Sequence, residues 1–186
     1  NERAGLTFST ALRSLLRQDP DVMMIGEIRD RETAQIAIEA ALTGHLVFST
    51  LHTNDAISAI PRLVNMGIES YLLAAAMNGV LAQRLVRRIC SHCKVTVAPD
   101  ARVEAMFAAR GIPLTALSRG EGCKSCGQTG FSGRAGIYEL FIIDDKLRDI
   151  ITSDSSLSPL KKEAKAQGHL DLAYDGLCKV AAGVTT

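Results

Sequence analysis

The chain has 186 residues, of which 47% are hydrophobic, enough to bury one full core and leave room for a small extra module. Its 21 basic and 20 acidic residues give a formal net charge of +1, so no excess of positive charge attracts nucleic acid or an anionic membrane. No apolar run approaches the length of a membrane span, and no signal segment opens the chain. We expect a cytoplasmic chain with a protein or small-ligand partner. Because the sequence begins at Asn1 and not at a Met, we also expect it to be a piece of a longer protein.

The first predicted elements are a helix and a short strand. Thr7 can cap a helix that runs to about Gln18, because apolar residues recur between them at helical spacing. The run Val22–Ile25 is continuously apolar and is bounded by Pro20 and Gly26. Such a run is typical of a strand that is buried on both faces of a parallel sheet.

A second helix and a second strand follow in the same order. Asp30 can cap a helix that ends at Gly44, and residues 46–50 form another buried strand directly before His52. This alternation predicts an α/β fold built from parallel β-α-β units. Ligands of such folds bind beyond the carboxyl ends of the strands.

A proline interrupts the third predicted helix, which closes at Gly67. Pro61 removes a backbone hydrogen bond there and is expected to bend or break the helix. Ser70 opens a further helix that is predicted to reach about Arg88. From Cys90 the chain is rich in Cys, Gly and polar turns, which indicates a small inserted module. The remaining predictions are a helix at 103–109, a strand at 135–143, and helices at 144–152, 159–167 and 170–182.

Two Cys-x-x-Cys pairs carry the strongest chemical signal in the chain. Cys90 and Cys93 form the first pair, and Cys123 and Cys126 form the second. Each pair can turn both thiolates toward one metal, and two pairs complete a closed tetrahedral site for structural Zn²⁺, with no position open for catalysis. The alternatives are two disulfides, which are disfavoured in a cytosolic chain, or four unrelated thiols.

Ionisable residues follow both predicted strands. Glu27 has the placement of a Walker B acid, a carboxylate that holds the water shell of magnesium or orients the attacking water. Acidic residues are common at strand ends, so a structural role stays open. His52 can contact a γ-phosphate, whereas His45 follows a helix-ending glycine and can equally be a polar cap.

The chain contains no phosphate-binding loop. Nowhere in the sequence is Gly-Lys followed by Ser or Thr, the end of a P-loop. If the chain belongs to a nucleotide-driven motor, we expect the P-loop upstream of Asn1.

Several stretches resemble the type II secretion and type IV pilus assembly ATPases. Residues 5–30, GLTFSTALRSLLRQDPDVMMIGEIRD, resemble the Walker B segment of that family, and residues 42–53, LTGHLVFSTLHT, resemble its His box. The segment LAQRLVR at 81–87 resembles the helix that follows its core, and the cysteine pairs resemble its metal-binding domain. The resemblance continues through GRAGIYEL at 133–140, DGL at 175–177 and GVT at 183–185.

The resemblance implies a motor ATPase with a RecA-like core. It implies Mg²⁺ and ATP at the subunit interfaces of a homo-hexamer, and a shape change that drives pseudopilus or pilus assembly through an inner-membrane platform with cytoplasmic recruiting proteins. Glu27 takes the Walker B role, and His45 and His52 take the His-box roles. The P-loop and the Asp box, a further catalytic acid, lie upstream. The expected domains are the second half of the RecA-like core at 1–89, the zinc module at 90–136, and a strand with a helical region at 137–186.

Two pathways remain open within this resemblance. The four-cysteine module favours assembly over retraction, since retraction motors generally lack it. Residues 136–140 and 143–145 favour type II secretion, with type IV pilus extension as the alternative. In either case we expect the protein at the inner membrane only through its partners.

Two other classes of function are alternatives. Arg84, Arg87 and Arg88 precede the metal site, as in a zinc-ribbon nucleic-acid binder, but the charge balance and the 4% aromatic content argue against this class. A salt-dependent titration with DNA would separate it from a motor. The chain could also serve only as a docking domain, which a comparison of ATP hydrolysis by the fragment and the full chain would decide.

Overall fold

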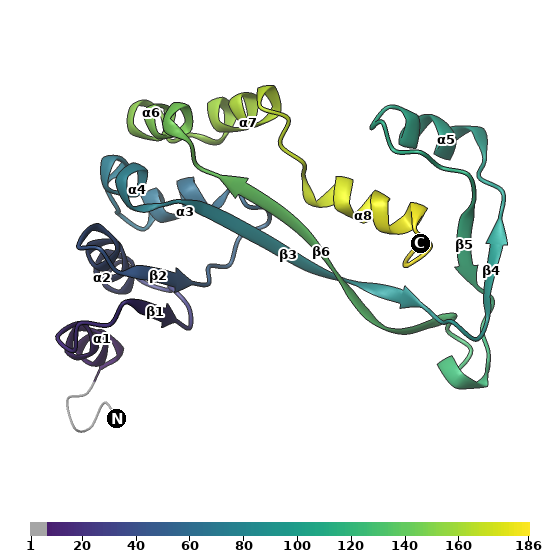
Figure 1. The fold of residues 1–186 in the computed structure, drawn as a ribbon, viewed down its shortest axis with the longest axis horizontal. Helices are drawn as coiled ribbons and strands as arrows, with labels where there is room; N and C mark the ends of the chain where they lie inside the picture. The colour runs from purple at the N-terminus through teal and green to yellow at the C-terminus, as the bar shows by residue number, and fades with distance from the viewer. Residues whose placement is uncertain (1–6) are drawn as a thin grey trace. The chain divides into compact units, whose positions relative to one another are not determined.

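A computed structural model describes residues 7–186, so Gly5 and Leu6 of the first resembling stretch lie outside the described part (Figure 1). The chain forms two compact units. The first contains the described residues up to Val80 together with Phe141–His169, and the second contains Leu81–Leu140 and Leu170–Thr186. Two of the three divisions, after Val80 and after Leu140, fall inside long strands, and the third follows His169 between two helices, whereas the boundaries expected from the sequence lie at residues 89 and 136.

The first unit begins with the predicted β-α-β arrangement. Its elements are α1 (Phe8–Leu16), β1 (Val22–Ile25), α2 (Arg31–Leu42) and β2 (Leu46–Ser49). The strands pair in parallel, with Val22 opposite Leu46 and Ile25 opposite Ser49. Both helix starts are confirmed, because the side chains of Thr7 and Asp30 accept hydrogen bonds from backbone N–H groups of the first turn.

The core of this β-α-β arrangement lies on one face of the strand pair. Its buried residues come from α1, β1 and α2: Leu12, Met23, Ile25, Ile36, Ala37 and Ala40. On the opposite face Met24 is 79% exposed and Phe48 is 54% exposed. The prediction of strands buried on both faces is therefore wrong within residues 7–186, since α1 and α2 cover one face only.

Two short helices follow β2. They are α3 (Ala59–Asn65) and α4 (Ser70–Ala76). Pro61 is the third residue of α3, inside the first turn, where backbone N–H groups have no partner within the helix. The expected bend at Pro61 is therefore wrong, because the helix begins too late for the proline to interrupt it.

Two C-terminal helices complete the first unit. They are α6 (Asp145–Ser153) and α7 (Leu157–Ala166), and both confirm predicted helices. α6 packs against α4 and α7. Leu73, Leu147, Ile151 and Leu160 are each at most 1% exposed, so they anchor these helices.

The helix predicted to run from Ser70 to Arg88 is wrong in its second half. α4 ends at Ala76, and Gly79–Ile89 form the long strand β3, which pairs with β6 (Phe131–Ile142). The segment at 81–87 that resembles a helix of the secretion ATPases is thus a strand, and Arg84, Arg87 and Arg88 lie on it. Pairing with a distant strand has overridden a weak local helix signal.

The second unit holds the cysteines. The strands β4 (Lys94–Val97) and β5 (Leu117–Gly120) pair in an antiparallel manner, and α5 (Ala101–Ala108) lies between them in the sequence. The last helix of the chain is α8 (Leu172–Ala181). Asp100 and Asp171 cap α5 and α8 through their side chains. The predicted helices at 103–109 and 170–182 are confirmed. No helix between residues 7 and 186 is both long and apolar enough to cross a membrane.

Candidate functional site

Glu27 and His52 meet at the carboxyl ends of β1 and β2. Glu27 follows β1 after Gly26, and His52 stands three residues beyond the end of β2. Because the strands are parallel, these ends lie at one edge, and Nε2 of His52 is 3.5 Å from Oε2 of Glu27. The structure thus brings together the two residues that the sequence analysis placed beyond the strands.

Arg29 contacts the same carboxylate and was not predicted from the sequence. Its Nη2 lies 2.5 Å from Oε1 of Glu27. This hydrogen bond lowers the pKa of Glu27; partial burial opposes the shift, and the charges of Arg29 and His52 reinforce it. Glu27 is therefore a carboxylate at neutral pH. The one feature of the sequence that could have predicted this contact is the position of a basic residue, Arg29, two residues after Glu27.

The second carboxylate oxygen of Glu27 is available to a ligand. Oε2 is buried, and its described contact, with Nε2 of His52 at 3.5 Å, is too long for a good hydrogen bond, although 32% of the Glu27 side chain is exposed. A buried carboxylate oxygen without a donor is costly, and a metal-bound or reacting water can satisfy it. Carboxylate oxygen is also a ligand that Mg²⁺ prefers, so Glu27 fits the acidic role expected of it.

His45 lies at the opposite end of β2 from His52. Its Nδ1 is 3.1 Å from the carbonyl of Ala40 and 3.2 Å from the hydroxyl of Thr43, at the end of α2. Its Nε2 is buried without a partner among the described residues. These contacts make His45 a polar cap at the end of α2, which is the alternative role that the sequence left open for it. They do not place His45 beside Glu27.

The loop after His52 is bonded to a C-terminal helix. Oδ1 of Asp55 accepts the backbone N–H of Ser58 at 2.8 Å, which satisfies a free donor at the start of α3. Oδ2 of Asp55 accepts a hydrogen bond from Nζ of Lys161 on α7 at 3.2 Å. Burial alone would raise the pKa of Asp55, but the bonds from Ser58 and Lys161 outweigh it and lower that pKa.

Asp55→Ala should destabilise the first unit by about 1 kcal/mol, because it removes a helix-start acceptor and an ion pair. Asp55 has a lowered folded-state pKa, so its contribution is full above the unfolded value of about 4 and is lost as the pH falls through the folded value. Thermal unfolding between pH 7 and pH 2 checks this. Lys161→Met removes the ion pair alone and should cost less. A deficit that stayed constant down to pH 2 would contradict the role given to the Asp55 charge.

The four predicted metal-binding cysteines converge in the second unit. All four Sγ atoms lie within 4.8 Å of one another. The Sγ distances are 3.9 Å for Cys90 to Cys123, 3.9 Å for Cys93 to Cys126, and 3.7 Å for Cys123 to Cys126. A tetrahedron with Zn–S bonds of about 2.3 Å has S···S edges of about 3.8 Å, whereas disulfide sulfurs are about 2.05 Å apart. The cluster therefore has the dimensions of a metal site, and all four cysteines are free thiols.

Backbone N–H groups point at two of these sulfurs. Gly122 donates to Cys93 at 3.3 Å, and Cys123 and Gly130 donate to Cys126 at 3.2 and 3.3 Å. Burial raises the pKa of Cys93 to about 11, while the two donors overcome burial at Cys126 and lower its pKa to about 6. The backbone donors at Cys126 thus favour its thiolate, the form in which cysteine binds metal.

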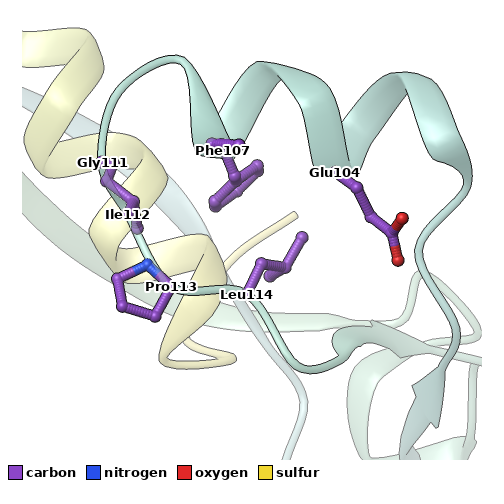
Figure 2. A pocket seen from close by; sticks show the side chains of 7 residues that line it. Glu104, Phe107, Gly111, Ile112, Pro113 and Leu114 are labelled. Carbon is purple, nitrogen blue, oxygen red and sulfur yellow. The ribbon is translucent and has the colours of Figure 1, made fainter.

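A separate hollow of about 420 Å³ lies beside α5 (Figure 2). Figure 2 shows Phe107 and Leu114 pointing toward each other, with Glu104 further along the helix. The hollow contains none of the predicted site residues, and Glu104 is its single ionisable lining residue. Its lining consists of Glu104, Phe107, Ala108, Gly111, Ile112, Pro113 and Leu114.

Comparison with known proteins places this arrangement in a family. The type IV pilus assembly ATPase PilB of Thermus thermophilus is 52% identical over 188 residues, which cover 100% of this chain and 21% of that protein. The type II secretion system protein HxcR of Pseudomonas aeruginosa is 52% identical over 186 residues, covering 100% of this chain and 36% of that protein. The chain thus spans well under half the length of these relatives.

A solved structure shares the fold. The pilus retraction motor PilT with bound ADP superposes with a TM-score of 0.66 and 28% identity, over 97% of this chain and 41% of that one. The α/β fold is therefore that of a known motor ATPase. The family model described as "Type II/IV secretion system protein" matches residues 1–186. The chain belongs to the type II/IV secretion system protein family.

Proposed function

We propose that this chain is the C-terminal part of a motor ATPase that powers pseudopilus or pilus assembly. The observation that carries the proposal is the pairing of Glu27 and His52 at one edge of two parallel strands, with an ionised carboxylate whose Oε2 has only the long 3.5 Å contact with Nε2 of His52. The names of the two relatives, a type IV pilus assembly ATPase and a type II secretion system protein, support it.

In this proposal the residues at the strand ends divide the work of hydrolysis. Glu27 orients a water through Oε2, and Arg29 keeps the carboxylate charged by holding Oε1. The His52 side chain is 90% exposed, so it can reach a terminal phosphate beyond the strands. Mg²⁺, when bound with ATP, would neutralise phosphate charge, and Glu27 is the residue in this chain that would hold its water shell.

The exposed face of the β1–β2 pair fits a core in which a further layer covers that face. Met24 and Phe48 are apolar and more than half exposed, an arrangement that soluble domains normally cover. We assign this pair to the second half of a RecA-like core at 1–89, whose other half carries the P-loop and the Asp box. Residues 90–136 are the zinc module, and 137–186 are the C-terminal strand and helices.

The cysteine cluster is assigned as a structural zinc site. Cys90, Cys93, Cys123 and Cys126 would supply four thiolate ligands to Zn²⁺ and leave no position for substrate, so the metal would stabilise the module rather than take part in hydrolysis. Catalytic zinc sites commonly include carboxylate or imidazole ligands. Among the residues that the structure describes, this cluster contains cysteines alone.

The assembly assigned to the motor follows the family. We assign a homo-hexamer in the cytoplasm that works at the inner membrane through a platform and recruiting proteins, with no nucleic acid as partner. Type II secretion is favoured over pilus extension on residues 136–140 and 143–145, while the relatives include both kinds. Restoration of secretion or of piliation in the corresponding null strain separates the two pathways.

The chain by itself should neither bind Mg-ATP tightly nor hydrolyse it. Affinity for the phosphates comes mainly from the N–H groups and lysine of a P-loop, and the charge of Glu27 repels the triphosphate. Calorimetry should show no binding tighter than about millimolar, equivalent to about −4 kcal/mol. The longer protein should bind and hydrolyse ATP in the same buffer. A micromolar dissociation constant for the chain alone would reveal a phosphate site that the proposal lacks, and an inactive longer protein would overturn the proposed function.

A further inference from the structure

A single residue beyond β2 holds the backbone on both sides of Glu27. The pairing of β1 with β2 ends at Ile25 opposite Ser49, so the next residues are outside the strand ladder. There the hydroxyl of Thr50 donates to the carbonyl of Gly26 at 2.5 Å. The carbonyl of Thr50 accepts the N–H of Ile28 at 2.9 Å. Thr50 therefore bonds to the residue before Glu27 and to the residue after it.

The far end of the same loop is fixed separately. Oδ1 of Asp30 accepts the N–H of Thr33 at 2.8 Å, and its Oδ2 accepts the Thr33 hydroxyl at 3.1 Å. Between Ile25 and Asp30, the two bonds of Thr50 therefore hold the backbone on either side of Glu27, while Arg29 and His52 contact its carboxylate. Thr50 also stands two residues before His52, so the same residue links the two groups that meet at 3.5 Å.

We propose that Thr50 is a positioning residue for ATP hydrolysis, which acts by fixing the backbone around Glu27; this inference rests on the proposed function. The physical reason is that the reaction rate is more sensitive than the folding free energy to the loss of this bond. One hydroxyl bond on an exposed loop contributes little to folding, whereas a misplacement of about 1 Å at a reacting group can reduce the rate about 100-fold. Loss of the hydroxyl should therefore affect turnover far more than stability.

The test compares three variants of the full-length protein. Thr50→Val keeps the shape and the backbone carbonyl and removes the bond to Gly26. It should lower kcat about 10- to 100-fold, with KM for ATP within about twofold and the melting temperature within about 2 °C of the parent. Thr50→Ser retains the hydroxyl and should restore most of the rate. Thr152→Val removes a hydroxyl that donates to a carbonyl on α6 at 2.9 Å, far along the chain from Glu27, and should leave kcat unchanged.

The outcomes separate this inference from the proposal on which it rests. An unchanged kcat in Thr50→Val overturns the positioning role, as does a raised KM with unchanged kcat, which would make Thr50 a nucleotide contact. Combined with Glu27→Gln, Thr50→Val should cause no further loss of rate, because the group that it positions is already disabled. An active Glu27→Gln variant would instead refute the proposed role of Glu27, whatever Thr50→Val shows.

Discussion

Glu27→Gln in the full-length protein should reduce ATP turnover by about 100-fold or more and leave nucleotide binding nearly intact. The substitution keeps the volume of the side chain and removes the charge that Arg29 maintains from 2.5 Å. A neutral amide accepts a proton poorly and orients water less strongly than a carboxylate. Steady-state hydrolysis with saturating Mg-ATP measures the effect on kcat.

Folding should be almost unaffected by the same change. Glu27 makes its contacts with side chains that are 75% and 90% exposed, so the melting temperature should stay within about 2 °C of the parent. Glu32→Gln is the matched control, since it neutralises a carboxylate in the first turn of α2 that pairs with Arg13 at 3.0 Å. Glu32→Gln should hydrolyse ATP normally. Parental turnover in Glu27→Gln would eliminate the assigned acid.

Cys93→Ser should abolish zinc binding and unfold the region between Ile89 and Gly136, while the first unit stays folded. The variant should unfold because structural zinc contributes about 10–16 kcal/mol to the folding free energy of small modules, more than the modest core of this region supplies. Metal analysis of the parent should give one zinc per chain and that of the variant none. Limited proteolysis should cut the variant within 90–136.

Cys178→Ser makes the same atomic change outside the cluster. Cys178 is a free, partly buried cysteine on α8 and is not among the four convergent thiols. This variant should retain one zinc and the parental proteolysis pattern. Four reactive thiols in metal-free protein whose second unit remains folded would contradict the metal's structural role.

The sequence alone determined the features that depend on neighbours within a turn or two. Thr7 and Asp30 predicted helix starts because a helix cap needs only a side-chain acceptor and a backbone N–H three residues later. Gly44 marked a helix end because its φ of +104° is open to glycine at little cost. Each Cys-x-x-Cys pair is likewise a local turn that the spacing predicts, whereas the contact of Cys90 with Cys123 joins segments 33 residues apart.

Contacts between distant segments were decided only by the tertiary structure. β3 is a strand because it pairs with β6, and a window around residues 81–87 contains no information about that partner. The same holds for Lys161 on Asp55, 106 residues away, and for Thr50 on Gly26, 24 residues away. Apolar spacing records which residues prefer to be buried, but not which segments meet. That choice depends on the free energy of the whole packed arrangement, which no local stretch of sequence contains.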